Sequence, residues 1–282
     1  LDLPASSVSA AARSAAQRCQ VHLGKIAKET PIPPLLRRWG WCSWDAHGVG
    51  VQRRHLEAMR QHHPAWMVLD DGWQEEVHSD EWRKWLHTPQ SRFDARDFDL
   101  SDLTKLLSED GIQLLVWHTL LGYWGGVSPN RGYAATSKRP WWPSGLRHVC
   151  PNEVDVWEGD FSVLEEQDFA RFYNDFYGSL AAAGVAGVKC DGQLLSDLLL
   201  GPCASISLAD AHQTAATQHF GEDAPVISCM AMTLCRVHTG AMGPCRVSDD
   251  HAYPGVPEDA ASVARHIWHC SMNSLWLAPF VY

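Results

Sequence analysis

Short apolar runs alternate with helix-like stretches along most of the chain, and this alternation restricts the fold more than any other feature. Strand-like runs lie at 38–45, 66–69, 114–118, 185–188, 226–229, 245–248 and 274–280, and helical patterns lie at 52–62, 103–109, 167–183, 207–220 and 258–272, with a connector at 199–204. Strands that alternate with helices are typical of an α/β protein with a parallel sheet. Seven strands with one long interruption, at 122–164, predict a (β/α)8 TIM barrel that lacks its last strand–helix unit. A doubly wound open sheet is the alternative.

The two ends of the chain differ from its middle. Residues 1–34 combine an Ala-rich helical pattern with a Pro-rich stop, so we expect a lead-in helix and a linker there. We expect residues 35–282 to form the barrel domain. The sequence begins without Met and ends inside an apolar run, which leads us to expect a catalytic domain that is incomplete at its C-terminal end.

Composition limits the classes of partner. The net charge of −10 argues against binding to nucleic acid or to an anionic membrane surface, and no apolar run approaches the ~20 residues that span a bilayer. Nine cysteines without C-x-x-C spacing are typical of reduced thiols, so we expect a cytoplasmic protein. No G-x-G-x-x-G follows the first strand, and we expect no cofactor.

Polar and aromatic side chains follow five of the predicted strands. They are Trp44 and Asp45, then Asp70 and Asp71, then Trp117 and His118, then Lys189 and Asp191, and finally Arg246, Asp249 and Asp250. In a parallel barrel, the ends of all strands meet at the carboxyl-terminal mouth. We therefore expect one pocket that holds several carboxylates, two cations and several tryptophans.

Such a pocket has the groups that glycoside cleavage needs. Carboxylates accept hydrogen bonds from sugar hydroxyls, tryptophan faces cover sugar rings, and two further carboxylates flank the glycosidic bond. Lys189 and Asp191 lie two residues apart on one face of a strand, so we expect Lys189 to lower the pKa of Asp191 and keep it ionised as a nucleophile. The structural alternatives are surface salt bridges, a capped turn at 70–71 and ordinary barrel packing at 117–118.

Seven motifs stand in order along the chain. They are Trp41-Cys42-Ser43-Trp44-Asp45-Ala46, Val68-Leu69-Asp70-Asp71-Gly72-Trp73-Gln74, Val116-Trp117-His118 with Gly122-Tyr123-Trp124-Gly125-Gly126-Val127, Phe172-Tyr173-Asn174, Gly187-Val188-Lys189-Cys190-Asp191, Ser228-Cys229-Met230 and Arg246-Val247-Ser248-Asp249-Asp250. Together they resemble the raffinose synthase family, which includes the alkaline α-galactosidases and seed imbibition proteins and belongs to the wider α-galactosidase clan. The resemblance covers nearly the whole chain.

The resemblance implies a (β/α)8 barrel and a retaining double displacement on α-galactosides. Asp191 would be the nucleophile and Asp250 the general acid/base, with their carboxyls roughly 5–6 Å apart. The substrate-binding side chains would be Trp44, Asp70, Asp71, Trp117, Lys189 and Arg246, with Asp70 and Asp71 on the galactose 4- and 6-hydroxyls and Trp44 against the sugar. The implied partners are small sugars. They are galactinol and sucrose for a galactosyltransferase, or raffinose-type oligosaccharides for an α-galactosidase.

Departures from the family pattern leave the activity open. Cys190 stands where the family usually has Val, His251 stands where it usually has an aromatic residue, and 231–233 replace a usual S-H-N. Transfer, hydrolysis and a non-catalytic galactoside-binding protein are the resulting alternatives. His251, His266 and His269 suggest a metal hydrolase as a further alternative, but no H-x-H follows the first strand and we expect no metal.

Overall fold

The structure, a computed structural model, describes Ser14, Arg18 and residues 32–75, 86–142, 157–231, 244–246 and 260–277. Its two compact units are residues 33–226, and residues 1–32 together with 227–282. The boundary between the units falls inside strand β7 (Val226–Ser228). The unit formed by residues 33–226 contains most of the sheet.

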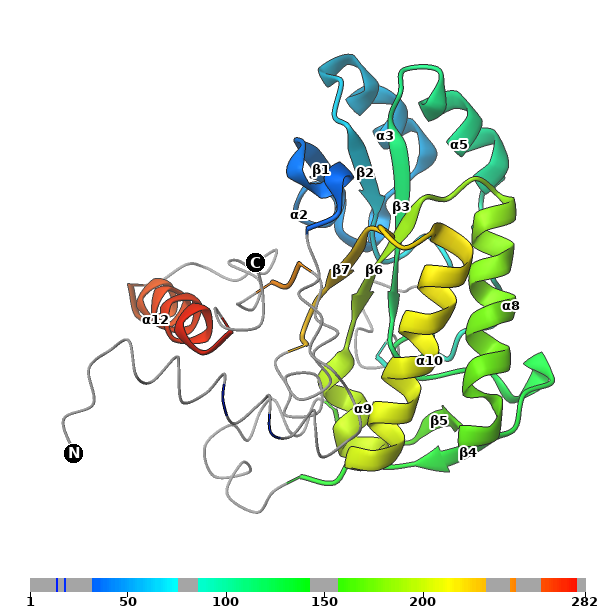
Figure 1. The fold of residues 1–282 in the computed structure, drawn as a ribbon, viewed down its shortest axis with the longest axis vertical. Coiled ribbons are helices and arrows are strands. Elements are labelled where there is room, and N and C mark those ends of the chain that lie inside the picture. Colours follow the sequence, from blue (N-terminus) through cyan, green and yellow to red (C-terminus); the bar gives the residue numbers. More distant parts are fainter. Residues whose placement is uncertain are drawn as a thin grey trace. The chain divides into compact units, whose positions relative to one another are not determined.

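A single parallel sheet organises this unit (Figure 1). Its strands are β1 (Gly40–Cys42), β2 (Trp66–Leu69), β3 (Gln113–Thr119), β6 (Gly187–Asp191) and β7, in that order across the sheet. The pairs β1–β2, β2–β3 and β3–β6 are parallel. The strand order follows the chain without reversal, whereas a doubly wound sheet reverses its order at a switch point. This order favours a barrel over the open-sheet alternative.

Side-chain contacts between distant strands require the sheet to be curled. Lys189 Nζ of β6 lies 3.9 Å from Cys42 Sγ of β1 and 2.7 Å from Asp70 Oδ2, one residue beyond β2. In a flat sheet the axes of β1 and β6 would be about 14 Å apart, because neighbouring strands are spaced by about 4.7–4.9 Å. A lysine and a cysteine side chain together do not cover that distance. The sheet is therefore a curled, parallel part-barrel with Lys189 on its concave face.

Helices connect these strands and pack against the sheet. They are α3 (Arg53–Met59), α5 (Leu100–Ser108), α8 (Phe169–Ala182), α9 (Gln193–Leu200) and α10 (Pro202–Phe220). Figure 1 shows α5, α8 and α10 on the same side of the sheet. Along α8, the buried side chains are Phe169, Phe172, Tyr173, Phe176, Tyr177 and Leu180. Their spacing of three and four residues forms one apolar stripe, which confirms the amphipathic helix predicted at 167–183.

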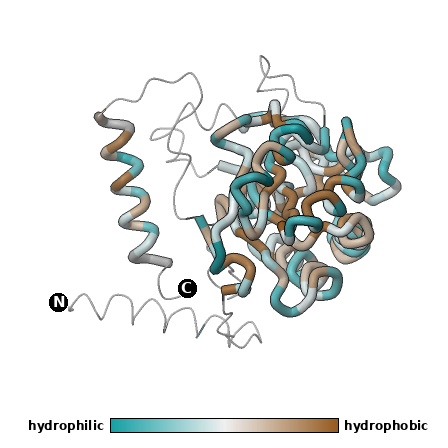
Figure 2. Tube along the Cα trace, turned by 90° about the horizontal axis from the view of Figure 1, so that it is seen from above, coloured by the Kyte–Doolittle hydropathy of each residue, from teal (hydrophilic) through white to brown (hydrophobic). Residues whose placement is uncertain are grey.

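The core lies between the sheet and these helices. Figure 2 shows hydrophobic residues gathered in the middle of this unit. Met67 and Leu69 of β2, Val116 of β3 and Val188 of β6 are each almost fully buried. Each such side chain contributes about 1.5–3 kcal/mol through the removal of its apolar surface from water. This packing fixes the positions at which the strands end.

The long interruption between β3 and α8 contains a two-stranded antiparallel sheet, β4 (Ala135–Lys138) with β5 (Phe161–Leu164). The sequence had predicted an irregular loop there. Gly126 joins this small sheet to the turn that follows β3. Its φ is +92°, and a side chain at this position would collide with the carbonyl oxygen of Ser162. Only glycine therefore allows the two backbones to approach so closely.

Two predicted boundaries were wrong within residues 33–226. The first strand ends at Cys42, and Trp44 already belongs to a short helix, α2 (Trp44–His47). The predicted connector at 199–204 contains the end of α9 and the start of α10, separated only by Gly201. Pro202 does not prevent helix formation, because the first turn of a helix tolerates a residue without an N–H group.

The predictions at the two ends of the chain have mixed outcomes. Residues 274–277, predicted as part of a strand, instead continue helix α12 (Ala260–Leu277). The helix can continue because no proline follows its start until position 279. The predicted strand at 245–248 is described up to 246, where Cys245 forms a parallel bridge with Ser228. The rest of both predicted strands, and all of the lead-in helix except Ser14 and Arg18, lie outside the described residues.

Among the helices that the structure describes, none combines the length and the apolar character needed to cross a bilayer.

We predict that Asp99 stabilises α5 as its N-terminal cap. Asp99 Oδ1 accepts hydrogen bonds from the N–H groups of Ser101 at 2.7 Å and Asp102 at 3.3 Å. Asp99→Ala should lower the free energy of unfolding by about 1 kcal/mol, because both N–H groups lose this acceptor. Asp99→Asn, which keeps an acceptor oxygen, should lose much less. Urea unfolding measures both variants, and equal losses would contradict the capping role.

Candidate active site

Five of the predicted site residues come together on the concave face of the sheet. They are Asp70 and Asp71 after β2, Trp117 in β3, and Lys189 and Asp191 in β6, and we call them the mouth cluster. Lys189 Nζ forms an ion pair with Asp70 Oδ2 at 2.7 Å, and Trp117 Nε1 donates a hydrogen bond to Asp191 Oδ2 at 3.1 Å. The three carboxylates of the cluster are almost entirely buried. Three of the five strand ends expected in one pocket therefore meet, whereas His118, also expected there, faces α8 and α10 because its side chain alternates with that of Trp117.

Asp70 is held by side chains from two other strands. Its Oδ2 accepts from Lys189 on β6 and from the Cys42 thiol on β1, at 3.0 Å. Its Oδ1 accepts from the N–H of Asp71, and its own N–H donates to Ser43 Oγ, both at 2.9 Å. A buried carboxylate without such partners would carry a large desolvation cost. The ionised form of Asp70 is thus matched by a cation and directed hydrogen bonds.

Asp71 has aromatic partners instead of a cation. Its Oδ1 accepts from the Tyr123 hydroxyl and its Oδ2 from Trp124 Nε1, both at 2.7 Å. Burial raises the pKa of Asp71 to about 7, and the nearby charge of Asp70 acts in the same direction. The hydrogen bonds from Trp124 and Tyr123 oppose this shift. The two adjacent carboxylates therefore have different electrostatic surroundings. Asp70 is paired with a lysine, whereas Asp71 has a pKa close to neutral pH.

Asp191 closes the cluster at the end of β6. Its Oδ1 accepts from the N–H of Gly192 at 2.7 Å, while its Oδ2 accepts from Trp117. Asp191 is buried, with 7% of the residue exposed, against 1% for Asp70 and Asp71. These two donors, on either side of the carboxyl group, fix its orientation. We expected Lys189 to act on Asp191, but the lysine donates its closest hydrogen bond to Asp70, as described above.

The other predicted site residues are not among the five of the mouth cluster. Trp44 begins α2 and is half-buried. Arg246 belongs to the second compact unit, where its N–H donates to the carbonyl of Ser228 at 2.9 Å. Asp249 and Asp250 lie outside the described residues. The expected short separation between Asp191 and Asp250 therefore stays a prediction.

The sequence reasoning missed three partners of the carboxylates. Cys42, Tyr123 and Trp124 donate to Asp70 or Asp71 through side chains that lie 28 to 53 positions away in the chain. All three stand inside quoted motifs, so the motifs were the available signal. Their roles could not be assigned, because no spacing rule connects a turn after β3 with the end of β2.

The metal alternative gains no support from helix α12. His266 and His269 both lie on this helix, and His251 lies outside the described residues. Within the part of the chain that the structure describes, His266 and His269 do not belong to a cluster of three metal-binding side chains.

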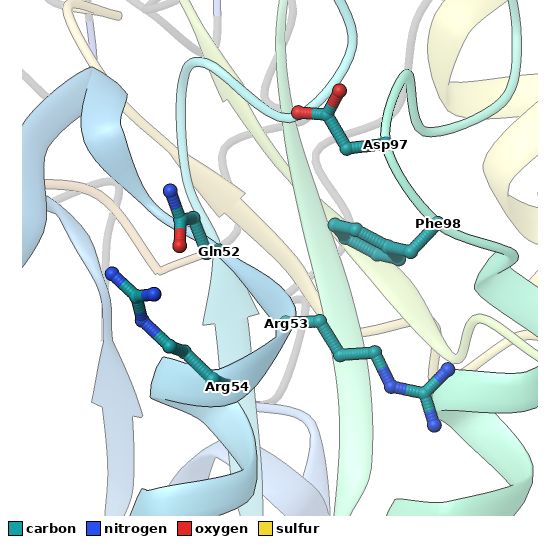
Figure 3. A pocket seen from close by; sticks show the side chains of 5 residues that line it. All are labelled: Gln52, Arg53, Arg54, Asp97 and Phe98. Atoms are coloured by element: carbon teal, nitrogen blue, oxygen red, sulfur yellow. The ribbon is translucent and has the colours of Figure 1, made fainter.

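A small cavity of about 280 Å³ lies away from the mouth cluster (Figure 3). It is lined by Gln52, Arg53, Arg54, Asp97 and Phe98, near the first turn of α3 and the segment before α5. Its lining contains none of the mouth-cluster side chains. We therefore do not place the substrate there.

Comparison with known proteins identifies the family. The model of the family described as raffinose synthase or seed imbibition protein Sip1 matches residues 90–282. The chain belongs to this family. A probable galactinol–sucrose galactosyltransferase from Arabidopsis thaliana is 27% identical over 93% of this raffinose synthase family chain. The chain spans 39% of the length of that relative.

Solved structures show the same fold. The GH36 α-galactosidase from Geobacillus stearothermophilus superposes with a TM-score of 0.54 at 15% identity, over 96% of this chain and 37% of that one. The α-galactosidase from Thermus thermophilus, in complex with stachyose, superposes with a TM-score of 0.53 at 15% identity, over 86% of this chain and 52% of that one. The curled parallel sheet of this raffinose synthase family member is thus of the α-galactosidase type.

We predict that Asp71 makes the stability of the protein depend on pH. Because its pKa is raised to about 7 in the folded state, the folded protein holds a proton that the unfolded chain releases above its usual pKa of 3.8. The free energy of unfolding should therefore fall as pH rises from about 4 to 7, by at most about 1.4 kcal/mol per pH unit. Urea unfolding across this range should show the fall in the wild type and a flatter profile in Asp71→Asn. Asp175→Asn, at an exposed position of α8, is the control and should keep the wild-type profile. Identical slopes in all three proteins would contradict the assignment.

We predict that the Cys42 thiol resists alkylation. Burial, together with the negative charge of Asp70, raises its pKa to about 12. At pH 8 its thiolate fraction should be roughly a thousandfold below that of an ordinary thiol, and the thiolate is the reactive form. Mass spectrometry after iodoacetamide treatment should find the exposed Cys203 modified long before Cys42. Similar rates at the two positions would show that Cys42 is not held as a protonated donor.

Proposed function

We propose that this chain is the catalytic part of a retaining α-galactosyl enzyme that transfers galactose from galactinol to sucrose. The observation that carries the proposal is the mouth cluster, in which three carboxylates, a lysine and a tryptophan meet on the concave face of the sheet. Family membership and the name of the Arabidopsis thaliana relative support the donor and the acceptor. We further propose that the sheet is the first part of a (β/α)8 barrel whose remaining strands follow β7.

The mouth cluster suits a galactose ring. Asp70 and Asp71 would accept hydrogen bonds from the 4- and 6-hydroxyls, because their carboxyls are already oriented by Lys189, Tyr123 and Trp124. Pre-oriented acceptors recognise a hydroxyl without the entropy loss of ordering a mobile side chain. Trp117 would contact the sugar beside Asp191, and Trp44 and Arg246 would complete the subsite.

The reaction would proceed in two displacements. Asp191 attacks the anomeric carbon of the donor, and the glycosidic C–O bond breaks while Asp250 gives its proton to the leaving oxygen. A hydroxyl of the acceptor then attacks the galactosyl-enzyme, Asp250 removes its proton, and Asp191 leaves as a carboxylate. The hydrogen bonds from Gly192 and Trp117 would hold the Asp191 carboxyl in one orientation for both attacks.

Transfer and hydrolysis share the first displacement. They differ in whether a sugar hydroxyl or water attacks the galactosyl-enzyme, so the residues around the acceptor decide between them. An α-galactosidase that hydrolyses raffinose-type oligosaccharides is therefore the second candidate, and it uses the same nucleophile.

We predict that Asp191→Asn abolishes product formation. The complete protein that contains this chain would be incubated with galactinol and sucrose, and raffinose and free galactose would be measured by chromatography. Raffinose is the expected product, and Asp191→Asn should reduce its rate by at least about a thousandfold, because an amide cannot form the covalent intermediate. Asp175→Asn is the matched control. It removes an exposed carboxylate on α8 and should keep full activity.

The other outcomes separate the alternatives. Free galactose without raffinose, lost again in Asp191→Asn, would identify a hydrolase. Galactose binding that quenches tryptophan fluorescence without any product would identify a non-catalytic galactoside-binding protein. Full activity in Asp191→Asn would refute the assignment of the nucleophile.

A further inference from the structure

Three metal-binding side chains lie together on the side of the sheet opposite the mouth cluster. They are His118 on β3, Cys190 on β6 and His212 on α10, and each is fully buried. One ligand atom of each residue lies within 4.8 Å of the ligand atoms of the other two. The sequence gave no reason to connect them, because they come from three separate elements and share no metal-binding spacing.

The alternation of side chains along β3 and β6 explains the position of this group. His118 pairs with Cys190 across the two strands, and Trp117 pairs with Lys189 one position earlier. Successive side chains of a strand point to opposite faces of the sheet. Because the mouth cluster occupies the concave face, His118 and Cys190 face the helices α8 and α10 (Figure 1).

The hydrogen bonds of His118 prepare it for metal binding. Its Nδ1 lies 2.8 Å from the carbonyl oxygen of Thr119, so Nδ1 must carry the proton and donate it. In the neutral ring Nε2 is then unprotonated, and its lone pair accepts a hydrogen bond from the Tyr177 hydroxyl at 2.8 Å. A histidine that donates one N–H to a carbonyl and presents the other nitrogen is the usual form of a metal ligand. Burial lowers the pKa of His118 to about 4, which keeps the ring neutral.

The composition of the group matches a zinc site. Two imidazoles and a thiolate are typical zinc ligands, and a fourth ligand completes the tetrahedron. Tyr177 supplies a hydroxyl at hydrogen-bond distance from His118, and its ring packs 5.7 Å from that of His212. With zinc–ligand bonds of about 2.0–2.3 Å, tetrahedral ligand atoms lie roughly 3.3–3.8 Å apart. The observed upper separation of 4.8 Å therefore requires a contraction of roughly 1 Å, within the reach of side-chain rotation.

We propose that His118, Cys190 and His212 bind one Zn²⁺ ion, with the Tyr177 oxygen as the fourth ligand. Binding releases the protons of the Cys190 thiol and of the Tyr177 hydroxyl, so that a thiolate and a phenolate bind the ion, and the bond from His118 Nε2 to zinc replaces its hydrogen bond from Tyr177. The ion would tie α10 to β3 and β6 and thus support the strands that carry the mouth cluster on their other face. The site is independent of the proposed galactosyl transfer, because it uses none of the residues assigned to that reaction.

The test is zinc retention after refolding. The protein is unfolded in denaturant with a reductant, refolded with ZnCl₂, and dialysed, and its zinc content and Tm are then measured. The wild type should retain stoichiometric zinc and gain thermal stability over protein refolded with a chelator, because the ion binds only the folded chain. Cys190→Val and His212→Gln should lose the zinc and the gain in Tm. Cys203→Ser removes an exposed thiol from the same helix, α10, and should keep both.

Refolding with Co²⁺ covers the case in which a variant does not fold. Cobalt bound to a thiolate gives a ligand-to-metal charge-transfer band in the near ultraviolet, and the wild type should show it. A wild type without zinc after dialysis would overturn the proposal, as would zinc content in Cys190→Val equal to that of the wild type. A wild-type cobalt spectrum without the thiolate band would also overturn it.

Discussion

The ion pair between Lys189 and Asp70 is the interaction on which the candidate site depends. It joins β6 to the end of β2 across the intervening strand β3, and the same lysine also reaches Cys42 of β1, which requires the sheet to be curled. The pair is buried, and breaking a buried pair by removing one partner commonly costs about 3–5 kcal/mol. Lys189 thus has a structural role in addition to any contact with substrate. A change at Lys189 would therefore affect the curl of the sheet and the charge of the candidate site together.

The same pair creates the asymmetry between Asp70 and Asp71. Asp70 receives a cation and a thiol, whereas the side-chain donors to Asp71 are the hydroxyl of Tyr123 and the indole of Trp124. Asp70 is therefore paired with a cation, while burial raises the pKa of Asp71 to about 7. A neutral sugar whose hydroxyls donate to both carboxyl groups would be bound by a lysine-paired acceptor, Asp70, and by Asp71, whose protonation changes near neutral pH.

The sequence allowed the sheet and most of the mouth cluster to be predicted, for a physical reason. Buried parallel strands are short apolar runs, and the polar residue that ends such a run marks its carboxyl-terminal edge. This rule found Asp70, Lys189 and Asp191 without any knowledge of the fold. It failed at Trp44, which begins a helix, because a tryptophan after a strand suits either conformation. It also could not find Tyr123, whose contact with Asp71 depends on a turn set by Gly126 and Ser162.

The five residues of β6 serve two faces at once, and this makes the strand sensitive to its register. Lys189 and Asp191 lie on the concave face, and Cys190 lies between them on the face that meets the helices. A shift of one residue exchanges the two faces of a strand completely. Loss of a single residue before Gly187 would therefore turn the thiol toward the concave face and bury both charges among the aromatic rings of α8. A substitution in this strand changes one side chain, whereas a change in its length displaces the side chains of both faces together.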